Sequence, residues 1–257
     1  MNDRQSGKFI KVLEKAYGAK DCGLIFSKMT GLNEGSSDGI FFREFEFSLV
    51  EDNPSIRILH LEFYDPNVGK NKIGELIEKR KNKILNFLDF LAAVSFNYDK
   101  KNCAKFFDFN QHGTWPIQVG IELGEKIKAK IYLSINNDKF DLEKFCQALD
   151  LNYGKIRGPL AHRKLDTVAI DLTGDGGFQI KIYPMEKPSQ GWLWRLSKDG
   201  SVASEKRWIR LSKGLLLDKK ELGFIDLPET VKDAIIENKL KISYFCSENK
   251  ARSIYVR

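Results

Sequence analysis

Residues 126–135 read KIKAKIYLSI, and the alternation of their side chains decides the fold class. The odd positions are all apolar, whereas the even positions carry three lysines, a tyrosine and a serine. Successive side chains of a strand point to opposite faces. This segment is therefore predicted to be a strand with one face in the core and one polar face.

The same alternation recurs in nine further segments, which pair across short turns into five hairpins. The turn composition is strong at residues 173–176 (Thr-Gly-Asp-Gly), and Asp199-Gly200 lies between two further strands. The ten predicted strands are 40–49 with 55–64, 116–123 with 126–135, 166–172 with 177–183, 192–197 with 205–212, and 239–246 with 251–257.

Helical spacing of apolar residues fills the intervals between most hairpins. It predicts helices over 8–18, 72–93, about 139–150, and from Pro228 to about 238. The interval from Pro184 to Gly191 is too short for a helix. Because the ββα unit recurs along the whole chain, we expect one domain over residues 1–257.

Half-polar antiparallel strands covered by helices allow two α+β architectures. One is an open sheet with helices on one face and water on the other. The alternative is a closed ten-stranded antiparallel β-barrel with helices outside and a polar lumen. Ten strands are many for a twisted open sheet, and closure removes exposed edges, so the barrel is favoured.

Composition excludes several classes of protein. The chain has 257 residues, of which 42% are hydrophobic, so disordered and low-complexity classes are excluded. No apolar run could span a membrane and the N-terminus lacks signal-peptide character, so we expect a cytoplasmic protein. The four cysteines are far apart, which favours reduced, buried thiols. The net charge of +7 favours anionic partners.

Lysines and tyrosines occupy the polar faces of two of the predicted strands. Lys130 and Tyr132 follow Lys128 on one, and Lys181 precedes Tyr183 on the other. Enclosed lysines repel one another unless an anion balances them, and charge-assisted hydrogen bonds to phosphate are strong. A diphosphate is the predicted ligand, although an open, solvated sheet would also tolerate these lysines.

Aromatic residues gather in the last four predicted strands, and Trp192, Trp194, Trp208 and Tyr255 are candidate binding residues. Aromatic faces attract cations and shield them from water. Cations beside an aromatic wall suggest a carbocation formed from a diphosphate ester, although these side chains could also be core residues.

The paired strands with "IKAKIYLSI" and "FQIKIYP" resemble the ABBA, or PT-barrel, prenyltransferases. The likeness is greatest to the cyanobactin-type enzymes that prenylate ribosomal macrocyclic peptides. It covers most of the chain from about Gly39, including "FFREFEFSL", "IRILHLEFYD" and "LKISYF". The resemblance implies that the diphosphate is held by Arg57, Lys128, Lys130, Lys181, Tyr183, Arg210 and Lys241.

The resemblance also implies an acidic residue on the first strand near the acceptor nucleophile. Glu44 fits this position, with Glu46 next to it, and either would act as general base. Both could alternatively pair with luminal lysines. An inward Arg57 would share its face with leucines, and a β-bulge would reconcile that arrangement.

The expected reaction moves a dimethylallyl, or longer isoprenyl, group from its diphosphate to a peptide side chain. Bulky Trp192 and Trp194 would shorten the pocket and favour dimethylallyl. Glu122 and Asp171, with Glu44 and Glu46, could pair with a guanidinium, so arginine is an acceptor option beside tyrosine, tryptophan, serine and threonine.

No two aspartates are adjacent, so the Asp-rich magnesium motif of chain-elongating prenyl synthases is missing. Protein cations would neutralise the leaving group, with Mg²⁺ at most an assistant and no organic cofactor. The expected partners are an isoprenyl diphosphate and a peptide, without nucleic acid or membrane. Two alternatives stay open: a small aromatic acceptor, or a non-catalytic basic sheet that binds nucleic acid.

Overall fold

The computed structural model describes residues 3–18, 22–31, 41–50, 56–63, 73–93, 96–108, 114–123, 127–161, 163–187, 189–248 and 251–256. The helices in these ranges are α1 (Asp3–Tyr17), α2 (Cys22–Gly31), α3 (Ile73–Ala93), α4 (Lys100–Asp108), α5 (Leu142–Ala148), α6 (Tyr153–Leu160), α7 (Lys219–Leu222) and α8 (Glu229–Glu237). The strands are β1 (Phe41–Val50), β2 (Ile56–Phe63), β3 (Thr114–Leu123), β4 (Lys128–Ile135), β5 (Leu165–Thr173), β6 (Phe178–Lys187), β7 (Gln190–Leu196), β8 (Val202–Leu215), β9 (Ile242–Glu248) and β10 (Ala251–Val256).

The strands form a closed antiparallel barrel in the order β1-β10-β9-β8-β7-β6-β5-β4-β3-β2. Each strand therefore neighbours the next one in the chain, and β1 pairs with β10 to close the ring. The predicted α+β barrel is confirmed, and all ten predicted strands are present. An open sheet, which the nucleic-acid alternative required, is contradicted by this closure.

Most helical intervals contain two helices where the apolar pattern predicted one. The described residues add α2, α4, α6 and α7 to the predicted set. These helices have at most ten residues, and α6 contains Gly154, Gly158 and Pro159, which ordinarily break a helical pattern. The direct connection from β6 to β7 is confirmed.

The chain divides into two compact units, which are described separately. Unit 1 comprises Met1–Tyr64, Gly120–Ile127 and Trp208–Arg257, and unit 2 comprises Asp65–Val119 and Lys128–Arg207. The expectation of one domain over residues 1–257 stays a prediction.

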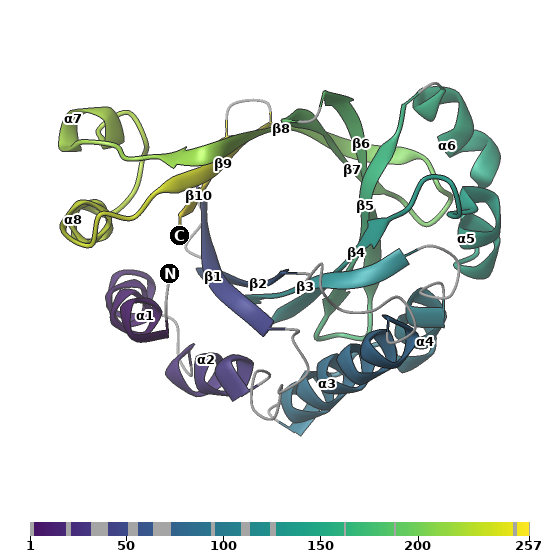
Figure 1. The fold of residues 1–257 in the computed structure, drawn as a ribbon, viewed down its shortest axis with the longest axis horizontal. Coiled ribbons are helices and arrows are strands. Elements are labelled where there is room, and N and C mark those ends of the chain that lie inside the picture. The colour runs from purple at the N-terminus through teal and green to yellow at the C-terminus, as the bar shows by residue number, and fades with distance from the viewer. Residues whose placement is uncertain are drawn as a thin grey trace. The chain divides into compact units, whose positions relative to one another are not determined.

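In unit 1, α1 and α2 pack on the apolar side of β1 (Figure 1). Phe9 of α1 meets Phe47 edge-on at a ring-centroid distance of 5.2 Å, and Phe26 of α2 lies 4.6 Å from Phe45. These two strand residues therefore face the helices. The residues that alternate with them, Glu46 among them, face the opposite side of the sheet.

In unit 2, α5 and α6 lie beside β4 and β5 (Figure 1), and α4 contacts β5. The ring of Phe106 in α4 meets Phe145 of α5 edge-on at 6.1 Å. The β5–β6 turn is tied to the residues after α3, since the Gly176 N–H donates to the Asn97 carbonyl at 2.9 Å. Among the described residues, none of the helices has the length and apolar composition needed to cross a bilayer.

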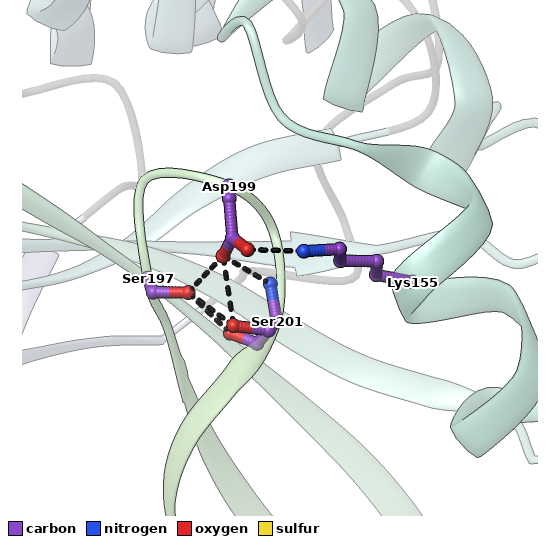
Figure 2. Close-up of polar contacts among 4 residues, drawn as sticks. All are labelled: Lys155, Ser197, Asp199 and Ser201. Carbon is purple, nitrogen blue, oxygen red and sulfur yellow. Dashed lines mark hydrogen bonds and ion pairs between the residues drawn. The ribbon is translucent and has the colours of Figure 1, made fainter.

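The β7–β8 turn in unit 2 is fixed by Asp199, as Figure 2 shows. Its carboxylate accepts hydrogen bonds from Ser197 Oγ and from the N–H and hydroxyl of Ser201, and it pairs with Lys155 of α6. Lys155 and the serines hold the pKa of Asp199 well below its usual range. Gly200 follows in the left-handed region with φ +81°.

Candidate functional site

A buried polar face in unit 2 is built by the register of four neighbouring strands. Lys130 of β4 stands opposite Asp171 of β5, and Lys181 of β6 stands opposite Arg195 of β7. Ala169 is the shared partner that places Tyr132 and Lys181 on this same face. The residues that alternate with them, such as Ile131 and Ile170, make the apolar face.

Charge is concentrated on this face although water has little access to it. Lys130, Asp171 and Lys181 are 6%, 7% and 4% exposed, and Lys181 forms an ion pair with Asp171. Burial lowers the pKa of Lys181, the positive charges of Lys130 and Arg195 lower it further, and Asp171 opposes the change. A bound anion would relieve the repulsion among these cations.

Tyrosine hydroxyls accompany the cations, as the Lys-x-Tyr order predicted. The rings of Tyr132 and Tyr183 lie 6.1 Å apart at a tilt of 54°. Lys128 is half-buried two residues before Lys130, opposite Thr173. The structure therefore brings together Lys128, Lys130, Tyr132, Asp171, Lys181 and Tyr183.

Arg195 joins this group although the sequence analysis missed it. Its Nη1 donates to Ser204 Oγ of β8 at 3.1 Å, which fixes the guanidinium on the polar face. The alternation of side chains along β7 could have identified it. Arg195 alternates with the two tryptophans of β7, so it faces the side they do not.

The placing of Trp192 and Trp194 beside the cations was wrong. Trp194 stands opposite Ile182, and Trp192 shares its face by alternation, so both lie on the apolar side of the sheet. Their faces receive Arg207 at 5.9 Å and Arg163 at 5.4 Å, respectively. These tryptophans therefore cannot shorten a pocket on the polar face.

Unit 1 holds a second polar face, which contains Arg57. Arg57 of β2 stands opposite Ser48 of β1, and its Nε lies 2.9 Å from Glu122 Oε2 of β3. The predicted inward direction of Arg57 is confirmed. The register from Arg57 to Leu61 is regular, so Arg57 shares its face with Leu59 and Leu61, and the shift between Phe42 and Glu44 does not separate them as the expected β-bulge would have done.

Glu46 is the buried carboxylate of β1 in unit 1. It is 2% exposed and accepts a hydrogen bond from Ser243 Oγ of β9. Tyr255 of β10, which stands opposite Ser48, shares this face and is half-buried. The side chain of Glu44 lies outside the part of the chain whose side chains are described.

Three other predicted residues have mixed outcomes. Trp208 in β8 is 7% exposed and therefore buried. Arg210 and Lys241 are exposed, and their contribution to holding a diphosphate stays a prediction. Lys241 precedes β9, and its Cβ packs against Gly214 of β8.

The described residues contain no group of three potential His, Cys, Asp or Glu metal ligands. Cys103, Cys146 and Cys246 are buried and reduced, as predicted. Burial raises the pKa of Cys103 and of Cys146 to about 12. These two thiols are therefore poor nucleophiles near neutral pH.

Comparison with known proteins places the fold. Neither a protein-family model nor a curated protein matches the sequence. Solved structures do match over nearly the whole chain. A 6-dimethylallyl tryptophan synthase is similar with a TM-score of 0.66 and 12% identity, covering 100% of this chain and 96% of that one.

Two further structures carry ligands of interest. The 5-dimethylallyl tryptophan synthase of Streptomyces coelicolor, in complex with DMASPP and Trp, has a TM-score of 0.62 and 11% identity, with 99% and 94% of the two chains covered. PriB in a binary complex with product diphosphate has a TM-score of 0.60 and 12% identity, with 99% and 95% covered.

At such identities the likeness establishes the fold. The chain folds as a ten-stranded barrel of the ABBA, or PT-barrel, type, as the sequence motifs predicted. Within that fold, unit 2 carries a buried cationic face with phenol donors, and unit 1 carries a buried carboxylate.

Proposed function

We propose that this protein is a prenyltransferase that moves a dimethylallyl group from its diphosphate to a nucleophilic side chain of a ribosomal, macrocyclic peptide. The observation that carries the proposal is the buried polar face of unit 2. There Lys130 stands opposite Asp171, and Lys181, which pairs with Asp171, stands opposite Arg195. Several cations on one polar face fit an anion with several oxygens, and a diphosphate is one.

The chemistry follows from the charges on this face. The bond between the isoprenyl carbon and the diphosphate oxygen breaks, and the leaving group keeps the electron pair. Lys130, Lys181 and Arg195 stabilise its developing charge, and the hydroxyls of Tyr132 and Tyr183 donate to its oxygens. The acceptor nucleophile then attacks the allylic cation and loses its proton.

Glu46 is the proposed base for that proton. It lies on the first strand, where the ABBA resemblance implies an acidic residue, and its burial keeps it from being solvated by bulk water. A base held in this way contributes about 10²- to 10⁴-fold to the rate of a proton transfer.

Dimethylallyl is the favoured donor because the similar structures act on that group or bind its analogue, as their names state. The acceptor is a separate question. Glu122 and Asp171 already pair with Arg57 and Lys181, so an incoming guanidinium would have to displace a protein cation. This weakens arginine relative to tyrosine, tryptophan, serine and threonine.

A small aromatic acceptor is the second candidate, because a similar structure was solved with Trp bound. In either case Mg²⁺ is at most an assistant bound through the diphosphate oxygens, while protein cations neutralise the leaving group.

The test is incubation with dimethylallyl or geranyl diphosphate and a panel of cyclic peptides, tryptophan and tyrosine, with and without EDTA. We expect one added dimethylallyl mass on a peptide. Transfer to free tryptophan alone would replace the peptide by the second candidate. No product with any acceptor, together with no donor binding by calorimetry, would refute prenyl transfer.

A further inference from the structure

Glu46 and Ser243 form a buried pair that the sequence does not reveal. Glu46 is 2% exposed on β1, and Ser243 is 1% exposed on β9, 197 residues further along the chain. Both belong to unit 1. A carboxylate desolvated to this degree is stable only with hydrogen-bond donors, and Ser243 Oγ is one of them.

Ser243 has a second acceptor within reach. Its Oγ lies 3.2 Å from the main-chain carbonyl oxygen of Tyr255 on β10. A serine hydroxyl has one proton to donate but two lone pairs with which to accept. A carbonyl oxygen can only accept, so the two neighbours of Ser243 compete for the same proton.

This competition defines two arrangements. When Glu46 is ionised, Ser243 donates its proton to the carboxylate. When Glu46 carries a proton on the oxygen that faces Ser243, the carboxyl group donates to Ser243 Oγ, and the serine proton turns to the carbonyl of Tyr255. Both protonation states are thus satisfied by one rotation about the Cβ–Oγ bond.

We propose that Ser243 is a positioning residue that follows the proton on Glu46 during turnover. This inference rests on the proposed function, in which Glu46 takes the proton of the acceptor. As the bond between acceptor and isoprenyl carbon forms, the acceptor proton moves to Glu46. Ser243 turns to Tyr255 in the same step, and the reverse rotation accompanies release of the proton to solvent.

Other polar groups lie on the same face of unit 1 as this pair. Arg57, opposite Ser48 on the same face, is paired with Glu122 at 2.9 Å, and Tyr255 adds a phenol on β10. Ser243 adds a hydroxyl and no charge. Its loss should therefore act on the proton of Glu46 more than on binding of an anionic donor.

The kinetic test compares Ser243→Ala with Ser243→Thr, which keeps the hydroxyl. We expect Ser243→Ala to lower kcat about tenfold, since hydrogen bonds to charged groups are worth more than neutral ones, with little change in KM. Its acidic limb in the pH profile of kcat should move to higher pH. Ser243→Thr should restore both quantities.

The control is Ser6→Ala. Ser6 in α1 is fully buried, and its hydroxyl has no hydrogen-bond partner among the described residues. We expect this variant to turn over like the parent. If Ser243→Ala keeps the parental kcat and pH profile, or loses activity only through KM, a positioning role is refuted.

An infrared measurement separates this inference from the proposed function, because it needs no substrate. The band of the protonated Glu46 carboxyl group is assigned by its loss in Glu46→Gln. This band should titrate at a higher pH in Ser243→Ala than in the parent. In Ser243→Thr it should titrate at the parental pH again. A band indifferent to Ser243 overturns the inference. Absence of transfer by the parent, with the band responding, refutes prenyl transfer while leaving the coupling of Ser243 to Glu46 established.

Discussion

Lys181, only 4% exposed, stands directly opposite Arg195 across the β6–β7 ladder. Like charges in this relationship destabilise a sheet, so the fold tolerates a local cost at this point. Asp171 offsets part of that cost through its ion pair with Lys181. The arrangement is understandable if a strongly anionic ligand completes it.

The affinity for diphosphate should therefore depend on pH through Lys181. The pKa of Lys181 is lowered to about 7 in the free protein, chiefly by burial. Below this pH the ammonium is charged and attracts the anion, and above it the proton is lost. Affinity should fall as pH rises from 7 to 9, by at most about tenfold per pH unit.

Calorimetry of inorganic diphosphate binding from pH 6 to 9 measures this effect. Lys181→Arg keeps its charge throughout and should show a much flatter profile. Lys139→Arg, at an exposed position, should keep the parental profile. A parental affinity that is constant over the range would exclude Lys181 as the titrating group.

Glu122→Gln should destabilise the protein by removing the partner of Arg57. The two side chains are only 15% and 7% exposed, so the unpaired guanidinium would be poorly solvated. We expect the free energy of unfolding to drop by about 2 to 4 kcal/mol, measured by urea denaturation. Glu78→Gln at an exposed position of α3 should change it by less than about 0.5 kcal/mol. Equal effects of the two substitutions would argue against the buried pair.

Donor chain length should respond to Leu193 and not to Trp192. Leu193 is 6% exposed and shares the face of Arg195, whereas Trp192 lies on the opposite face. Leu193→Ala should raise the ratio of kcat/KM for geranyl over dimethylallyl diphosphate about tenfold. The shorter side chain leaves more space on the polar face for the longer donor. Trp192→Ala should leave that ratio unchanged. The reverse result would return the tryptophan to the pocket.

Gly200→Ala should be costly because the turn has no room for a methyl group. Gly200 has φ +81°, and a Cβ there would lie 2.8 Å from both the main-chain N and O of Asn152. We expect a loss of at least about 1 to 3 kcal/mol in the free energy of unfolding. Gly7→Ala within α1 meets only an ordinary contact at 3.8 Å and should stabilise by about 0.5 to 1 kcal/mol. Similar stability of the two variants would refute this strain.

Most of the strands could be predicted because their side chains alternate between an apolar and a polar set. In β4 and β6 this pattern also gave the correct face for Lys130 and Lys181. It could not do so in β7, whose sequence QGWLWRL is nearly apolar on both faces. In β7 the two tryptophans were assigned to the polar face because of their size, although Arg195 identifies the opposite face as the polar one.

Two other features depend on tertiary structure that no local pattern encodes. The contact between Glu46 and Ser243 joins strands 197 residues apart. The register of neighbouring strands determines which carboxylates pair with Arg57 and Lys181. The alternation within one strand does not contain this information. The short helix α6 was missed because glycine and proline are rare in helix interiors, and here packing overrides that preference.

The pairing of β1 with β10 has a consequence for biosynthesis. Phe47 stands opposite Val256, so the two edges of the sheet join only after about 200 intervening residues have been made. The meander from β5 to β7 can assemble early from local contacts. One edge of β1, by contrast, stays unpaired until β10 has been synthesised. During translation the unpaired edge of β1 is a binding site for a chaperone. It is also the place where two nascent chains could exchange β1 or β10.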